Sequence, residues 1–231
     1  MERPTFRREA DVLYRRQRRQ GGIALVWLLV LLLGGCNQIA GNVIQVAQTA
    51  VSERLPVQLP SRSDIAALPY AQIWVQGLGK DARLVLGEVD EGRLAWYSAD
   101  GTILFTRDGQ LVGSHGIGTA SLMDVRSAQL PADLRDIADG HVSQRHYDLM
   151  PGYRYGVPVT GTWSRHGVET VDVAADRQMA LLRLEERLDG PGIQATQVYW
   201  VDPYTGQLWK SRQWLAPGRL VDITVLKPYR R

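Results

Sequence analysis

Three pairs of an acidic residue followed by glycine, each between two apolar runs, constrain the fold of this chain more than any other feature. The pairs are Glu91-Gly92, Asp100-Gly101 and Asp108-Gly109, spaced eight or nine residues apart. Such a pair is typical of a two-residue hairpin turn, because a type I′ turn needs positive φ at both central positions. The spacing predicts an antiparallel meander, in which each strand pairs with the next one along the chain.

Strand-like runs continue to the end of the chain. The predicted strands cover residues 82–89, 93–99, 102–107, 110–112, 141–148, 153–163, 168–173, 179–188, 196–201, 207–215 and 221–226. We expect residues 113–120 to form a glycine-rich loop, and residues 131–139 to form a short helix with Pro131 in its first turn. The predicted fold class is all-β: an antiparallel meander forming a curved sheet or open half-barrel, with one or two short helices.

The first 35 residues have the layout of a secretory signal. Seven arginines precede an uncharged segment, residues 21–35, whose core is apolar. As a helix this segment would be about 22 Å long, shorter than the roughly 30 Å hydrocarbon core of a bilayer. This favours a signal peptide over a membrane-spanning helix. The segment ends in Leu33-Gly34-Gly35-Cys36, which contains the only cysteine of the chain.

This junction resembles the lipobox of bacterial lipoproteins, in which the cysteine becomes a lipidated N-terminus. Small residues let the signal peptidase reach the backbone, and the thiol is the nucleophile that accepts diacylglycerol. We therefore expect a signal peptide at residues 1–35 and a permanent acyl anchor on Cys36. The alternative is a free thiol within a signal anchor. Asn37, where an Asp would retain the protein on the inner membrane, indicates the outer membrane.

The net charge of +3 arises from the basic residues of the predicted signal peptide. Residues 1–35 hold seven of the 27 basic and three of the 24 acidic residues, which leaves 20 basic and 21 acidic residues in the rest of the chain. This near-neutral remainder gives no reason to expect a nucleic-acid partner. We expect residues 36–62 to be a lipid-attached tether, part of it helical, and residues 63–231 to be a single β-rich domain. With a single cysteine, the domain can form no internal disulfide.

Motifs for catalysis or metal binding are weak throughout the chain. The histidines, His115, His141, His146 and His166, lack the spacing of metal ligands. Residues 113–118 form a glycine-rich stretch without the Lys-Ser/Thr of a phosphate loop, and no G-x-S-x-G elbow is present. Glu185 and Glu186 are adjacent and would point to opposite faces of a strand, unlike paired glycosidase acids. We predict no catalytic residue, no metal site and no cofactor.

Tryptophan and tyrosine far outnumber phenylalanine, with seven and nine residues against two. Two interpretations remain open. These amphipathic rings could stack on sugars or lie at a membrane interface, or they could build the core of the sheet, where both residue types are common. Under the first interpretation, the candidate glycan-binding residues are Trp96, Trp200, Trp209 and Trp214. Trp209 and Trp214 are five residues apart and cannot share one face of a regular strand.

Several segments in the same order resemble the YjbF/GfcB (YmcC-like) family of lipoproteins, which is associated with extracellular polysaccharide and group 4 capsule gene clusters. They are the lipobox and residues 64–75, 94–112, 198–218 and 226–229. The resemblance implies a curved β-meander similar to an open half-barrel. It also implies an outer-membrane lipoprotein that faces the periplasm and assists polysaccharide export or assembly. It supplies no catalytic residues to carry over to this chain.

Three functions remain under consideration. The favoured one is a non-enzymatic accessory lipoprotein for extracellular polysaccharide or capsule, which binds glycan or a protein of the export machinery through an aromatic face. The alternative is a half-barrel carrier that holds a lipid or a lipid-linked sugar in its concave face, which requires an apolar cavity. A polysaccharide-modifying enzyme would require carboxylates or histidines that converge in a cleft.

Overall fold

The computed structural model describes residues 59–118, 121–128 and 133–230, which include twelve strands in one antiparallel sheet. The predicted signal peptide, Cys36 and residues 37–58 of the predicted tether lie outside the described residues. The strands are β1 (Gln72–Gln76), β2 (Ala82–Asp90), β3 (Arg93–Tyr97), β4 (Ile103–Arg107), β5 (Gln110–His115), β6 (Ser121–Ala128), β7 (Val142–Met150), β8 (Arg154–Ala174), β9 (Arg177–Gly190), β10 (Ile193–Val201), β11 (Leu208–Ala216) and β12 (Arg219–Lys227).

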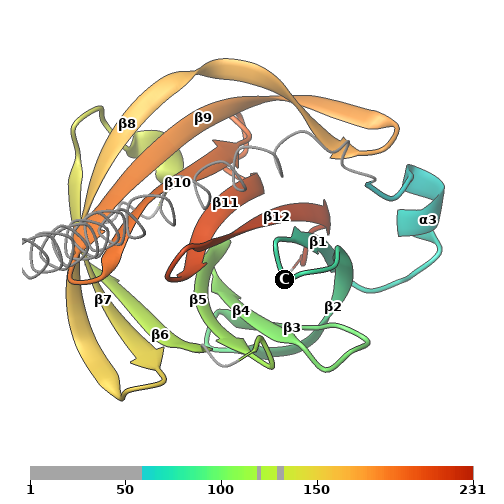
Figure 1. Cartoon of the computed structure of the whole chain (residues 1–231). Helices are drawn as coiled ribbons and strands as arrows, with labels where there is room; N and C mark the ends of the chain where they lie inside the picture. The colour runs from blue at the N-terminus through green and yellow to red at the C-terminus, as the bar shows by residue number, and fades with distance from the viewer. Residues whose placement is uncertain (1–58, 119–120, 129–132, 231) are drawn as a thin grey trace, which may run out of the picture. The chain divides into compact units, whose positions relative to one another are not determined.

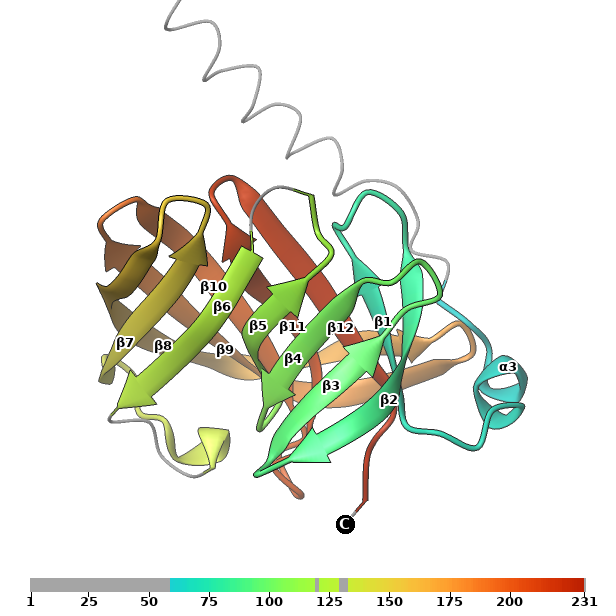
Figure 2. The ribbon, with the colours of Figure 1, turned by 90° about the horizontal axis from the view of Figure 1, so that it is seen from below.

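The sheet consists of two meanders joined through the first and last strands. Its order is β5-β4-β3-β2-β1-β12-β11-β10-β9-β8-β7-β6, and β1 pairs with β12 from Gln72↔Lys227 to Gln76↔Asp222. Strands β5 and β6 are therefore the two edges. The sheet curls until these edges lie side by side (Figures 1 and 2), where the Leu122 amide donates to Ser114 Oγ at 3.0 Å. The predicted all-β meander is confirmed, and the curled sheet is nearly closed.

Two of the three predicted turns have the expected backbone. Glu91 and Gly92 have φ of 43° and 81°, and Asp108 and Gly109 have φ of 51° and 76°, so both central positions of each hairpin are positive. In the middle turn only Gly101 has positive φ, at 86°. The Asp100 carboxylate there accepts bonds from the Ser98 hydroxyl and the Thr102 amide, which stabilises a longer connection.

Other elements differ from the prediction. Residues 154–174 form one strand, β8, because a register shift between Arg165 and Val168 absorbs the residues that were expected to separate two strands. Strands β1 and β6 were not predicted, and β5 extends through His115 into the expected loop. The expected helix over 131–139 is reduced to a 3-10 turn, η2 (Leu134–Asp136), capped by Asp133. A short helix, α3 (Arg62–Ala66), begins with a capping box between Ser61 and Asp64.

The core fills the inside of the curl and continues on its outside. Inside, the Tyr147 and Trp214 rings meet edge to face, with centroids 5.4 Å apart. Outside, the far ends of β8 and β9 pack against Trp209 through Val171 and Leu181. Strand β11 is thus covered on both faces, and its burial departs from strict alternation, since Trp214, Leu215 and Ala216 are all buried. No helix in residues 59–118, 121–128 or 133–230 is long and apolar enough to cross a membrane.

Candidate functional site

A cavity of about 860 Å³ opens inside the curled sheet, within the size range of small-ligand sites. We call it the inner cavity. Its apolar lining is Ile73, Leu94, Trp96, Val112, Val125, Leu134, Leu208, Ile223 and Val225. Its polar lining is Thr106, Arg107, Asp108, Gln110, Arg126, Ser127, Asp133, Thr205 and Gln207. Polar and apolar side chains thus share the lining, and a surface of both kinds can contact the carbon skeleton and the polar groups of an organic ligand.

Strand alternation explains how these side chains reach the cavity. Leu94 and Trp96 are two residues apart on β3, Gln110 and Val112 on β5, and the same spacing holds on β6. Residues two apart share one face of a strand, so each strand contributes a pair from its concave side. The two edge strands, β5 and β6, both contribute, and the cavity therefore depends on the curl that brings them together.

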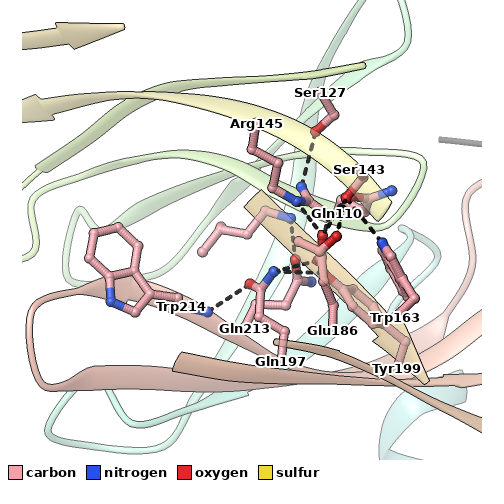
Figure 3. Close-up of polar contacts among 12 residues, drawn as sticks. Gln110, Ser127, Ser143, Arg145, Trp163, Glu186, Gln197, Tyr199, Gln213 and Trp214 are labelled. Atoms are coloured by element: carbon pink, nitrogen blue, oxygen red, sulfur yellow. Dashed lines mark hydrogen bonds and ion pairs between the residues drawn. The ribbon is translucent and has the colours of Figure 1, made fainter. Parts of the chain in front are cut away.

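A buried ion pair lies behind the wall of the cavity. Arg145 on β7 is 2% exposed, and Glu186 on β9 is 0% exposed. Arg145 Nε lies 2.7 Å from Glu186 Oε1 and Nη2 lies 2.7 Å from Oε2, which is the bidentate arrangement of a guanidinium with a carboxylate (Figure 3).

Further donors satisfy the Glu186 carboxylate. Ser143 Oγ donates to Oε1 at 3.0 Å, and Gln197 Nε2 and the Tyr199 hydroxyl donate to Oε2 at 2.9 and 3.2 Å. Trp163 Nε1 in turn donates to Ser143 Oγ at 3.1 Å. A buried carboxylate with this many donors is compensated for its loss of hydration.

The electrostatics of this group favour fixed protonation states. Burial opposes the charge on Arg145, but the Glu186 carboxylate, together with Tyr199 and Tyr147, outweighs this effect and holds the pKa of Arg145 above its usual value. Burial, followed by the charge of Glu186, raises the pKa of Tyr199 well above its ordinary range. The guanidinium therefore stays charged and the phenol stays protonated at neutral pH.

A glycine makes room for this cluster. Gly161 on β8 pairs with Ser143 on one side and Leu188 on the other. A Cβ at position 161 would lie 2.1 Å from Glu186 Oε1 and 2.6 Å from Ser143 Oγ. Since the carboxylate is held by several donors, it cannot move aside easily, and the position requires glycine.

The ion pair reaches the inner cavity through two lining residues. Arg145 Nη1 donates to Ser127 Oγ at 3.0 Å, and Nη2 donates to Gln110 Oε1 at 2.8 Å. Gln110 is on edge strand β5 and Ser127 is on edge strand β6, so one guanidinium bridges the two edges of the sheet (Figure 3).

The four candidate tryptophans do not gather on one face. Trp96, Trp209 and Trp214 are 3%, 8% and 3% exposed, and they belong to the cavity wall, the outer cluster and the inner core respectively. Trp200 is half-buried; its Nε1 donates to Glu169, and Lys210 Nζ lies 5.7 Å from the centre of its ring. Burial thus supports the core-forming interpretation for Trp209 and Trp214, while Trp96 lines the cavity.

The described residues include no group of three or more His, Cys, Asp or Glu side chains arranged to hold a metal ion. Glu185 and Glu186 point to opposite faces, and Glu185 is paired with Arg183 and His166 instead.

Sequence reasoning did not identify Arg145, Gln110 or Ser127 as site residues. A signal was present, because strand alternation places Arg145 and Glu186 among apolar residues on the inward faces of β7 and β9.

The chain is similar to known lipoproteins over most of its length. The family model described as "Group 4 capsule polysaccharide lipoprotein gfcB, YjbF" matches residues 44–226. The uncharacterized lipoprotein GfcB of Escherichia coli (strain K12) is 27% identical over 210 residues, which cover 87% of this chain and 96% of that protein. The crystal structure of the hypothetical lipoprotein YmcC from Escherichia coli (K12) matches with a TM-score of 0.65 and 25% identity, covering 80% of this chain and 96% of that one. The chain therefore belongs to the GfcB/YjbF family of group 4 capsule polysaccharide lipoproteins, as its sequence motifs predicted.

Proposed function

We propose that this protein is a non-enzymatic outer-membrane lipoprotein, anchored through lipid on Cys36 and facing the periplasm, that assists export or assembly of extracellular polysaccharide by binding glycan in the inner cavity. The observation that carries the proposal is the cavity itself: about 860 Å³, with an apolar floor beside hydrogen-bonding side chains. A sugar ring has an apolar face and a polar edge, so a lining of both kinds suits it. Family membership supports the link to capsule polysaccharide.

The chemistry of the buried acid favours binding over catalysis. A general acid or base must exchange a proton with its substrate within hydrogen-bond reach. The oxygens of Glu186 are occupied by Arg145, Ser143, Gln197 and Tyr199. Glu186 is fully buried and touches the cavity only through Arg145 and the two lining residues that Arg145 holds.

Gene deletion with complementation tests this function. Deletion should reduce the amount of surface polysaccharide, and wild-type protein should restore it. Leu94→Trp, which fills the cavity from a half-buried lining position, should fail to restore it. The matched control is Val89→Trp, at a position on β2 that is 43% exposed, and it should restore the polysaccharide. A separate variant, Cys36→Ser, tests whether the function needs the lipid anchor. An unchanged amount of surface polysaccharide after gene deletion would contradict the proposal.

A second candidate function is supported by the nine apolar side chains of the cavity lining. A carrier of a lipid or a lipid-linked sugar would hold acyl chains against this surface. Protein purified from cell envelopes should then release acyl-containing molecules into organic solvent, detectable by mass spectrometry, and Leu94→Trp should release less. Extracts without such molecules would exclude the carrier.

A further inference from the structure

We propose that the inner cavity selects an acidic sugar, whose carboxylate binds at the seam between β5 and β6. This inference rests on the proposed function and narrows it to a class of glycan. It follows from the direction in which the buried guanidinium of Arg145 orients the polar side chains of the cavity wall (Figure 3).

The orientation of the Gln110 amide is determined by its partner. A guanidinium has only donors, so the Gln110 atom that lies 2.8 Å from Arg145 Nη2 must be the acceptor Oε1. The other end of the amide, Nε2, carries two hydrogens, and it has no hydrogen-bond partner among the residues that the structure describes. Gln110 is half-buried and lines the cavity, so these hydrogens are available to a ligand.

Arg145 also fixes the hydrogen-bonding role of Ser127. Its Oγ accepts from Arg145 Nη1 at 3.0 Å, which leaves the hydroxyl proton to donate elsewhere. Thr106 repeats the pattern further along the wall, because its Oγ1 accepts from Trp96 Nε1 at 2.8 Å. The inner wall therefore presents donors to the cavity, while the acceptor atoms of Gln110, Ser127 and Thr106 face their protein partners.

The charged side chains at the cavity rim do not explain a preference for an acidic ligand. Arg126 is paired with Asp148, and Asp133 is paired with Arg135. The remaining lining charges, Arg107 and Asp108, are adjacent and opposite in sign. Selection thus rests on the donors at the seam. A carboxylate is an acceptor only and can accept from both Gln110 Nε2 and the Ser127 hydroxyl. A sugar hydroxyl also brings a proton, and the Gln110 oxygen that could accept it is already bound to Arg145.

Titration calorimetry of the full-length, detergent-purified protein tests the inference. The ligands are a hexuronate oligosaccharide, the same oligosaccharide with its carboxylates reduced to alcohols, and inorganic phosphate, a small anion without a sugar ring. We expect the acidic oligosaccharide to bind at least tenfold more tightly than its reduced counterpart. Equal affinity of the two oligosaccharides, no binding of either, or binding of phosphate alone would overturn the inference.

Gln110→Glu is the decisive variant. It keeps an oxygen for Arg145 but replaces the inward donor by a second, negatively charged acceptor, so affinity for the acidic oligosaccharide should fall at least tenfold. The matched control is Gln194→Glu, which adds the same charge at an exposed position near the start of β10. Ser127→Ala, which removes one donor without adding charge, should weaken binding several-fold and keeps the test valid if Gln110→Glu unfolds.

The outcomes separate this inference from the proposed function. If both variants bind the acidic oligosaccharide as the wild type does, the seam is not the site, even where gene deletion still reduces surface polysaccharide. If the acidic oligosaccharide binds at the seam but deletion leaves surface polysaccharide unchanged, the inference stands and the proposed role in export or assembly fails.

Discussion

Arg145 and Glu186 form a bidentate ion pair, with both nitrogen–oxygen distances at 2.7 Å, between strands β7 and β9, which are separated by β8. Both side chains are at most 2% exposed. The pair is tied to both edges of the sheet through Gln110 and Ser127, so it belongs at once to the core and to the wall of the inner cavity.

Glu186→Gln should be strongly destabilising. It removes the carboxylate that pairs with a buried guanidinium, so the free energy of unfolding should fall by about 3–5 kcal/mol. Urea denaturation followed by tryptophan fluorescence measures the change. Its matched control is Glu185→Gln, one residue away, where the carboxylate is 25% exposed and pairs with Arg183, which is 31% exposed. That change should cost under about 1 kcal/mol. Similar losses for the two variants would contradict a special role for the buried pair.

Gly161→Ala should destabilise the same cluster through its backbone position. The added methyl would lie 2.1 Å from Glu186 Oε1, and overpacking of this kind costs about 1–3 kcal/mol. The control is Gly167→Ala on the same strand, where an added Cβ meets nothing within 4 Å. Thermal unfolding should show a lower midpoint for the first variant only. A lowered midpoint for both would point to the strand as a whole instead of the Glu186 pocket.

Gln213 should stabilise an edge of the sheet from a distance. Its Oε1 accepts from the Leu111 amide at 2.8 Å and its Nε2 donates to the Gly109 carbonyl at 3.0 Å, so a side chain of β11 occupies backbone groups at edge strand β5. Gln213→Leu leaves both groups unpaired and should cost about 1–3 kcal/mol.

Hydrogen exchange checks this assignment directly. The Leu111 amide should exchange faster in Gln213→Leu than in the wild type, while the exposed substitution Gln178→Leu should leave its protection unchanged. Unaltered protection of Leu111 in Gln213→Leu would show that another group holds the edge.

Acid should weaken the β6–β7 pairing through Asp148. The Arg126 guanidinium, at 2.8 Å, and the Gly156 amide, at 2.7 Å, hold the pKa of this carboxyl below its usual value. A carboxyl with a lowered folded pKa contributes stability that is present above the unfolded pKa of about 3.9. This stability is lost as the pH falls through the lower folded pKa.

Asp148→Asn tests this dependence. It should cost about 1 kcal/mol at pH 7, because Arg126 is 54% exposed and solvent screens the pair. The difference between variant and wild type should shrink as unfolding is measured from pH 7 down to pH 2. A difference that stays constant over that range would assign the loss to packing instead of charge.

Much of the fold can be predicted from short stretches of sequence, because turns and strands depend on the backbone preferences of a few adjacent residues. Positive φ is required at adjacent turn positions, and Glu91-Gly92 and Asp108-Gly109 meet that requirement where the pattern predicts it. The break predicted within β8 was wrong, because a register shift at His166 and Gly167 absorbs one extra residue without ending the strand.

Alternation along β7 and β9 is also a property of the sequence alone, and it assigns Arg145 and Glu186 to inward faces. Which inward residues meet is a different question. It is decided by the register of three strands, by the absence of a side chain at Gly161, and by the pairing of β1 with β12 across about 150 residues of chain. That long-range pairing joins the two meanders into one sheet. The curl of the joined sheet then encloses the cavity, and the packing of distant strands inside it has no periodic signal in the sequence.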